Sequence, residues 1–148
     1  NRWENIYINP QNIPSILPLL SEIHSIAIEE FYTKLAPHQT LVIPHELLGY
    51  EKNEFWFNSA LPGESTAVHN HNGKAVISGV YYLQVTEKSG NVIFINENKE
   101  ELEIPAKPRK LIFFPAGLDH YVKENKGSEK RISMSFNCYL FPLTIPKS

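Results

Sequence analysis

Two histidines separated by a single residue, His69 and His71, are the feature of this sequence with the clearest chemical potential. They end a stretch that is predicted to be a strand, residues 66–71, and in a strand residues two apart point to the same face. Two imidazoles on one face can bind a single metal ion. The alternative interpretation is a pair of surface histidines beside the turn signal Asn72-Gly73.

A third imidazole, His120, follows an apolar segment much further along the chain. An antiparallel jelly roll can return a distant strand to the side of an earlier one, so this fold would allow His120 to be a third ligand. Taken alone, such a histidine is more often a partly exposed residue at the start of a strand. The remaining histidines are assigned structural roles: His24 on a helix face, and His38 and His45 on the surface of a proline-rich connection.

A strict alternation of polar and apolar residues marks the predicted strand 130–140. One face carries Arg131, Ser133, Ser135 and Asn137, and the other carries Ile132, Met134, Phe136 and Cys138. Both faces are expected to be covered, because one is apolar and the other is uncharged after its arginine. An arginine in that position can pair with a protein carboxylate or hold a carboxylate ligand through two hydrogen bonds. An exposed arginine at a strand end is the third possibility.

These candidates must be positioned by one helix and a series of short strands. Apolar residues at three- and four-residue steps predict a helix over 16–35, beginning near Pro14 and Ser15. The rest of the chain alternates strand-like runs with Gly, Pro and Asn turn signals, which is typical of an antiparallel sandwich or jelly roll. The predicted strands are 54–58, 66–71, 76–85, 91–95, 102–104, 110–114, 120–123 and 130–140. The helix is expected to pack on the outside of one sheet.

Length, charge and cysteine content limit the class of protein. With 148 residues, the chain is predicted to form a single domain, 1–148, with a helical N-terminal cover over 1–50 and a β core over 51–148. Fourteen basic and 16 acidic residues leave no positive surplus for an obligatory nucleic-acid partner. The single cysteine, the absence of a long apolar run and the absence of a signal peptide predict a cytoplasmic protein without a membrane partner. A homodimer is compatible with these features.

Three further positions receive structural predictions. Trp56 and Phe57 alternate on a strand, so one should face the core while the other could line a substrate entrance. Gly79 either lets two backbones approach closely or marks a bulge. Cys138 shares a face with apolar residues and is predicted to be a buried, inert thiol.

The order of the motifs resembles the prolyl-hydroxylase-like branch of the iron(II)/2-oxoglutarate-dependent oxygenases. More narrowly, the chain is similar to a small bacterial and phage group of 2-oxoglutarate–iron(II) oxygenases with a His-x-His motif. The resemblance covers about residues 55–137. It rests on Trp56-Phe57-Asn58, Pro62-Gly63, His69-Asn70-His71, Ser78-Gly79-Val80-Tyr81-Tyr82, Ser89-Gly90, Phe114-Pro115, His120-Tyr121-Val122 and residues 131–137.

This resemblance implies a fold, a cofactor and an activity. The fold would be a mainly β double-stranded β-helix, a cupin-like jelly roll, that holds one Fe(II). The activity would be that of a 2-oxoglutarate-dependent dioxygenase that hydroxylates an unidentified small-molecule or peptide substrate. By position, His69 and His120 would be metal ligands, and His71 would stand where the wider family has aspartate. Arg131, Tyr82 and Ser133 would bind 2-oxoglutarate, the arginine at its far carboxylate.

An all-histidine site carries one negative charge fewer than two histidines and a carboxylate, and it also suits Zn, Ni and Cu. Two other functions therefore stay open: a three-histidine cupin-like dioxygenase that does not use 2-oxoglutarate, and a non-catalytic jelly-roll binding module. Asp119 is predicted to point away from the metal, whereas Glu64 in the preceding loop could reach it. Asn70 and Asn72 are predicted to orient the imidazoles.

Overall fold

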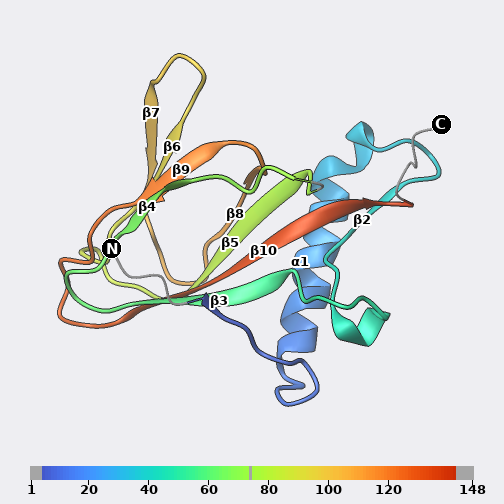
Figure 1. The fold of residues 1–148 in the computed structure, drawn as a ribbon, viewed down its shortest axis with the longest axis horizontal. Coiled ribbons are helices and arrows are strands. Elements are labelled where there is room, and N and C mark those ends of the chain that lie inside the picture. Colours follow the sequence, from blue (N-terminus) through green and yellow to red (C-terminus); the bar gives the residue numbers. More distant parts are fainter. Residues whose placement is uncertain (1–4, 74, 143–148) are drawn as a thin grey trace.

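Two antiparallel sheets face one another, and one helix covers the outer side of the larger sheet (Figure 1). The computed structural model describes residues 5–73 and 75–142. The larger sheet has the order β1-β3-β10-β5-β8, with β2 paired to β10, and the smaller has the order β4-β9-β6-β7. Their bounds are β1 Asn5–Ile6, β2 Thr40–Val42, β3 Phe55–Ala60, β4 Thr66–His69, β5 Ile77–Gln84, β6 Val92–Ile95, β7 Glu101–Ile104, β8 Leu111–Pro115, β9 Asp119–Val122 and β10 Arg131–Phe141.

The predicted fold class is confirmed: the molecule is a mainly β double-stranded β-helix with an N-terminal helix packed on one sheet. The strands lie within about two residues of their predicted positions, since β-branched and aromatic runs between turn residues mark them well. The N-terminal cover is less helical than predicted. Its strand β1 pairs with β3, and its strand β2 pairs with β10, so residues before 50 also extend the larger sheet.

The helix α1 (Ile16–Phe31) contributes one apolar stripe to the main core. It ends four residues earlier than predicted, where a short 3₁₀ helix, Tyr32–Lys34, continues the chain. The buried residues of the stripe are Ile16, Leu20, Ile23 and Ala27, and they pack against apolar side chains of β3 and β10. This packing covers one face of the larger sheet and leaves its other face directed toward the smaller sheet (Figure 1).

Strand β10 separates the core from the interior cavity. It pairs with β3 on one side and with β5 on the other. Its apolar face, including Met134, Phe136 and Cys138, is buried in the helix-covered core. Its polar face is buried as well, with Arg131 only 4 % exposed. The predicted division of this strand into an apolar and a polar covered face is therefore confirmed.

Gly79 in β5 makes room for the Phe136 ring. A Cβ atom at position 79 would overlap three carbon atoms of that ring. The ring is fully buried, so it cannot move toward solvent to accept the extra methyl group. Of the two predicted reasons for this glycine, close approach is correct, but the approaching group is a side chain and not a backbone.

Candidate metal centre

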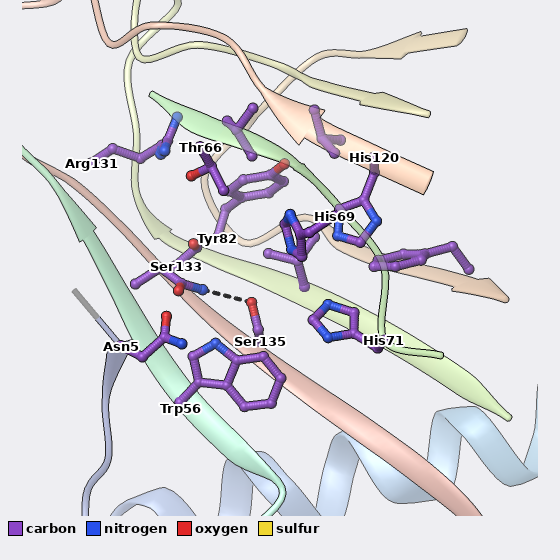
Figure 2. Close-up of a pocket in the computed structure, with 15 residues that line it drawn as sticks. Asn5, Trp56, Thr66, His69, His71, Tyr82, His120, Arg131, Ser133 and Ser135 are labelled. Atoms are coloured by element: carbon purple, nitrogen blue, oxygen red, sulfur yellow. Dashed lines mark hydrogen bonds between the residues drawn. The ribbon is translucent and has the colours of Figure 1, made fainter. Parts of the chain in front are cut away.

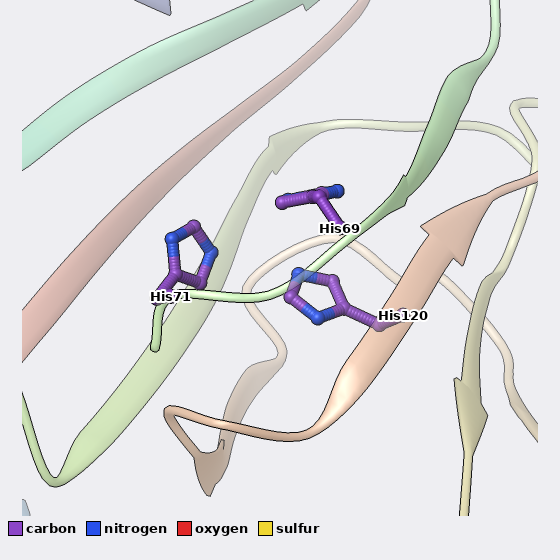
Figure 3. Close-up of side chains that lie close together, drawn as sticks. All are labelled: His69, His71 and His120. Atoms are coloured by element: carbon purple, nitrogen blue, oxygen red, sulfur yellow. The ribbon is translucent and has the colours of Figure 1, made fainter. Parts of the chain in front are cut away.

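Three histidines meet at one end of the smaller sheet (Figure 3). His69 ends β4 and lies directly opposite His120 of β9 in the strand register. His71 follows two residues after the end of β4. The three possible ligand atoms lie within 4.8 Å of one another, and the ring centroids are 4.2, 5.1 and 5.3 Å apart. The sequence-predicted ligands are thus brought together.

The reason that His71 joins this group differs from the prediction. The strand ends at His69, and the β4–β9 register shifts between Thr66 and His69, so the same-face rule for strands does not apply across the His-x-His motif. Instead, the His71 N–H donates to the carbonyl of Ala116 at 2.8 Å. This hydrogen bond fixes the chain just after the strand and lets its imidazole turn back toward the other two.

Backbone carbonyls set the tautomer of two imidazoles. The Nδ1 of His69 lies 2.9 Å from the Ala67 oxygen, and the Nδ1 of His120 lies 2.9 Å from the Leu118 oxygen. A carbonyl only accepts hydrogen bonds, so each Nδ1 carries the proton and each Nε2 presents a lone pair. This is the usual arrangement for a histidine that binds metal through Nε2.

The orienting role of Asn70 and Asn72 stays a prediction, and the structure shows other partners for both residues. Asn70 Nδ2 donates to Asp119 at 2.8 Å, and its Oδ1 accepts the Asn72 N–H at 3.1 Å. These bonds brace the loop after β4 and do not reach the imidazoles. Asp119 and His120 are successive residues of β9, so their side chains lie on opposite faces of the strand. Asp119 therefore points away from the metal centre, as predicted.

Burial keeps the imidazoles in the form that binds metal. It lowers the pKa of His71 to about 4, with the neighbouring His69 adding to the shift and Glu54 opposing it. Burial also lowers the pKa of His120 to about 4, where the Leu118 carbonyl and Asp119 oppose the shift and the two other histidines add to it. Both rings are neutral at pH 7, so a metal ion meets no competing protons there.

No carboxylate completes this group within the described residues. Glu64, considered as a ligand from sequence, instead accepts the Leu61 N–H at 2.7 Å and closes its own turn. Aromatic rings surround the imidazoles: Phe114 lies 4.8 Å from His120, and Trp56 lies 5.6 Å from His71, measured between centroids. Three imidazole nitrogen donors in a mostly apolar setting suit a divalent transition metal such as Fe(II), Zn or Cu.

A cavity runs from the three histidines to Arg131 between the two sheets (Figure 2). Arg131 is almost fully buried, and its Nη1 donates to the Ser89 carbonyl at 2.8 Å and the Lys123 carbonyl at 3.5 Å. Among residues 5–73 and 75–142, no carboxylate pairs with it. The interpretation as an exposed arginine is therefore wrong. The described residues offer no carboxylate partner, which favours the interpretation as a binding group for a carboxylate ligand.

Tyr82 and Ser133 are partners in the β5–β10 register and line the same cavity as Arg131. Both are buried, at 3 and 6 % exposure. Burial raises the pKa of Tyr82 to about 12, although the positive charge of Arg131 opposes the shift. Its hydroxyl therefore stays protonated and can donate a hydrogen bond. Burial also lowers the pKa of Arg131, because the guanidinium is largely removed from water.

The loop at Ser89-Gly90 holds the Arg131 side chain through the Ser89 carbonyl. Gly90 has φ +87°, and a Cβ atom there would overlap the backbone at Lys123. Only glycine allows the two backbone segments that accept from Arg131 to lie this close together. The Ser-Gly motif, noted in the sequence only as part of the resemblance, thus holds the arginine in place.

Trp56 lines the cavity, whereas Phe57 packs against the main core, so the predicted division of this pair is confirmed.

Cys138 is buried as predicted, and burial raises the pKa of its thiol to about 12. His24 Nε2 donates to the Leu41 carbonyl oxygen at 2.6 Å, which fits its structural role. His45 was predicted on the surface, but it is buried against Phe55, with ring centroids 6.5 Å apart.

Glu54 is a residue near the site whose role sequence reasoning missed. Its Oε2 accepts from Asn137 Nδ2 at 3.1 Å, and Asn137 Oδ1 accepts from Ser78 at 2.7 Å. The main chains of Glu54 and Asn137 are also hydrogen-bonded at 2.8 Å. Asn137, the last polar residue in the alternating pattern of β10, is the signal that could have led to Glu54. A buried amide at that position requires a hydrogen-bond partner from the neighbouring segment of the chain.

A double-stranded β-helix that places three imidazoles and a buried arginine in one cavity defines a jelly-roll protein with a candidate metal centre. Comparison with known proteins shows what this chain is similar to. A family model described as "Putative 2OG-Fe(II) oxygenase" matches residues 95–137, a segment that includes His120, Arg131 and Ser133. No curated protein matches the chain.

Solved structures share the fold. One is an oxidoreductase of the 2OG-Fe(II) oxygenase family from Burkholderia pseudomallei, with TM-score 0.54, 15 % identity, and coverage of 57 % of this chain and 42 % of that one. Another is the non-heme alpha ketoglutarate dependent epimerase SnoN from nogalamycin biosynthesis, with TM-score 0.50, 14 % identity, and coverage of 57 and 44 %. At such identities, the likeness establishes the fold.

The chain spans less than half the length of each of these two proteins. Together, the family match and the shared fold confirm the predicted resemblance to 2-oxoglutarate–iron(II) oxygenases. Within the described ranges, no helix has both the length and the apolar character that crossing a membrane requires.

Proposed function

We propose that this protein is an Fe(II)- and 2-oxoglutarate-dependent dioxygenase that hydroxylates its substrate. The observation that carries the proposal is Arg131, a buried cation without a carboxylate partner among the described residues, in the same cavity as three histidines. A buried charge without a counter-ion is costly, so it is expected to serve an anionic ligand. 2-Oxoglutarate offers a carboxylate for the arginine and a second carboxylate with a keto group for a metal.

The overall reaction balances without any further reactant. Substrate R–H, O₂ and 2-oxoglutarate give R–OH, succinate and CO₂. Bound Fe(II) would supply the redox chemistry that couples the decarboxylation to the C–H oxidation. The protein's own contribution is to hold the metal through His69, His71 and His120.

The other cavity residues bind and orient the co-substrate. Arg131 offers two-point hydrogen bonding to its far carboxylate, and the protonated Tyr82 hydroxyl and Ser133 can donate to the same group. Apolar side chains of Val80, Val92 and Phe114 line the space between the arginine and the imidazoles. They exclude water from that space, which strengthens the hydrogen bonds to the carboxylate.

An anaerobic titration tests this proposal. Fe(II) chelated by 2-oxoglutarate gives a visible charge-transfer band, so we expect the band with the native protein. Arg131→Lys keeps the charge but loses two-point binding, and we expect at least about tenfold weaker 2-oxoglutarate binding. Arg109→Lys is the matched control at an exposed position and should leave the titration unchanged. Iron binding without any band would contradict the proposal.

The all-histidine ligand set favours one second candidate, a dioxygenase that does not use 2-oxoglutarate. Its specific support is that no carboxylate joins the three histidines within the described part of the chain. Such an enzyme would consume O₂ with Fe(II) and substrate alone. Oxygen uptake that is independent of 2-oxoglutarate would favour this candidate, and its absence would exclude it.

We further propose that the protein works in the cytoplasm, where its single buried thiol stays reduced. Neither nucleic acid nor membrane is proposed as a partner, because the chain lacks a basic surplus. A homodimer is compatible with the exposed outer faces, and light scattering of the purified protein would decide between one and two copies.

A further inference from the structure

A second recess adjoins the metal centre on the side away from Arg131. It shares His69, His71 and Trp56 with the main cavity. Its other walls are mostly polar, and the ones that matter here are Tyr7, Lys52, Glu54 and Asn137. The two spaces therefore meet at the imidazoles, and a molecule in the second recess would lie against them.

We propose that this recess binds a cationic group of the substrate, an alkylammonium or guanidinium, with Glu54 as its counter-ion. The inference rests on the proposed oxygenase function, because it names the class of substrate that would reach the same metal. The support comes from the charge distribution, the hydrogen bonds around Glu54 and the aromatic walls.

Glu54 is held as a fixed carboxylate. Only 12 % of its side chain is exposed. Its Oε2 accepts from Asn137, and Asn137 is itself fixed by the buried hydroxyl of Ser78. Such a chain of hydrogen bonds orients the carboxylate toward the recess. A largely buried carboxylate calls for a cation nearby.

The only cation that contacts Glu54 among the described residues is Lys52, and this contact is weak. Lys52 Nζ lies 3.6 Å from Glu54 Oε1, beyond hydrogen-bond distance, and the lysine side chain is 73 % exposed. Because the lysine is exposed and makes no hydrogen bond to the carboxylate, this contact contributes little and is screened by salt. Lys52 therefore covers the carboxylate at the surface, and a cationic ligand that enters the recess can replace it.

Aromatic rings next to this carboxylate also favour a cation. The rings of Tyr7 and Trp56 lie 6.2 Å apart, and Trp56 lies 5.6 Å from His71. Trp56 is 8 % exposed and forms the boundary with the main cavity, while Tyr7 is 56 % exposed at the rim. Tryptophan and tyrosine are the side chains whose faces attract cations most strongly.

Charge separates the two ends of the site. The far end holds the buried guanidinium of Arg131, which repels a cation and attracts a dianion. The near end holds Glu54, which does the reverse. The metal centre lies between them, and Figure 2 shows Trp56 and His71 on the side of the cavity opposite Arg131. An anionic co-substrate and a cationic substrate would thus be directed to different sides of the metal.

Trp56 provides a direct readout of binding. The only other tryptophan is Trp3, so Trp3→Phe leaves Trp56 as the sole source of tryptophan fluorescence. In this background, the metal-free full chain is titrated with two probes that carry the same cation, L-lysine and Nα-acetyl-L-lysine methylamide. The neutral control is Nα-acetyl-L-norleucine methylamide, which has the same chain without the ammonium. The tighter of the two cationic probes shows whether the source is a free amine or a side chain within a peptide.

We expect saturable quenching by at least one cationic probe and at least about tenfold weaker binding of the neutral one. Glu54→Gln keeps the size and the contact with Asn137 and should weaken cation binding by about tenfold. Lys52→Ala changes an exposed side chain and should tighten it by about two- to fivefold, since the competing ammonium is gone. Opposite effects from neighbouring variants are difficult to obtain from a loss of folding.

The proposal is overturned if neither cationic probe binds at millimolar concentration, or if the neutral probe binds equally well. It is also overturned if Glu54→Gln leaves probe binding unchanged but weakens Fe(II) binding, since Glu54 would then serve only the metal centre through His71. If Glu54→Gln does not fold, the Lys52→Ala variant decides: unchanged or weaker binding of the cationic probe by this variant overturns the proposal. This titration needs neither iron nor 2-oxoglutarate, so its failure is distinguishable from the absence of a chelate band, which contradicts only the oxygenase function.

Discussion

His69 and His120 face each other across the β4–β9 strand pair, with their ring centroids 4.2 Å apart. The sheet register therefore sets the separation of two ligands before any metal binds. His120 is nearly fully buried and its ring is confined by Phe94 and Phe114, with centroids 5.9 and 4.8 Å away. Two ligands on paired strands and a third on the following turn make a centre whose geometry depends on strand pairing.

Acidification should destabilise the metal-free protein between about pH 6.5 and 4. The pKa values of His71 and His120 are lowered to about 4 in the folded state from 6.5. The unfolded chain then binds more protons within this window, so stability is complete above it and falls with pH. We expect a loss of roughly 2–4 kcal/mol for the pair, screened because His71 is half-buried. Urea unfolding at a series of pH values measures it.

A matched variant checks the assignment of this pH dependence. His38 is exposed, and His38→Gln should leave the slope of stability against pH as it is in the native protein. His120→Gln should flatten the slope by removing one of the two groups. An unchanged slope in the His120 variant would show that other groups titrate in this window.

The strands could be predicted from local sequence, whereas several site features could not. Strand β10 carries its own signal, because alternation along Arg131–Phe141 reports burial on both faces. The position of His71 carries no such signal. It depends on where β4 ends and on a hydrogen bond to Ala116, a residue distant in sequence. A parity argument stops being valid at the end of a strand.

Burial of polar residues was also beyond local reasoning. His45 lies in a proline-rich segment that looks like a surface connection, yet it packs against Phe55. Its Nδ1 has no hydrogen-bond partner within the described chain, and burial lowers its pKa. The two residues of β1 are too few to show any periodicity. Such features arise from contacts between distant segments, which a single sequence does not report.

Replacing Gly79 by alanine should destabilise the core without touching the metal centre. The new methyl group would overlap the buried Phe136 ring, and overpacking of this kind costs about 1–3 kcal/mol. Urea unfolding of the metal-free protein at pH 7 measures the loss. Gly117→Ala is the control, because the nearest atom to its Cβ lies at an ordinary 3.9 Å. Phe136→Leu added to Gly79→Ala should recover part of the stability, and full additivity of the two losses would contradict this explanation.

Binding of 2-oxoglutarate should stabilise the protein through Arg131. With the metal site loaded by Zn, a ligand at about 100 times its Kd adds about 2.7 kcal/mol to the free energy of unfolding. Arg131→Met retains the length of the side chain and removes the guanidinium. We expect its thermal unfolding to be unaffected by 2-oxoglutarate, while the native protein and the Arg109→Met control show a concentration-dependent rise in Tm. An equal rise in the Arg131 variant would place the co-substrate elsewhere.

The charge of the ligand set should be adjustable at His71. His71→Asp would add a carboxylate to the two strand-held imidazoles and create two nitrogen ligands and one oxygen ligand. A unit negative charge this close to a metal stabilises the higher oxidation state, so we expect the Fe(III)/Fe(II) potential to fall by on the order of 0.1 V. Selectivity for Cu and Zn over Fe(II) should fall as well, because the added ligand is an oxygen. Potentiometry and metal competition measure both effects. His71→Asn has the same size and no charge, so equal potentials in the Asp and Asn variants would show that charge at this position does not tune the metal.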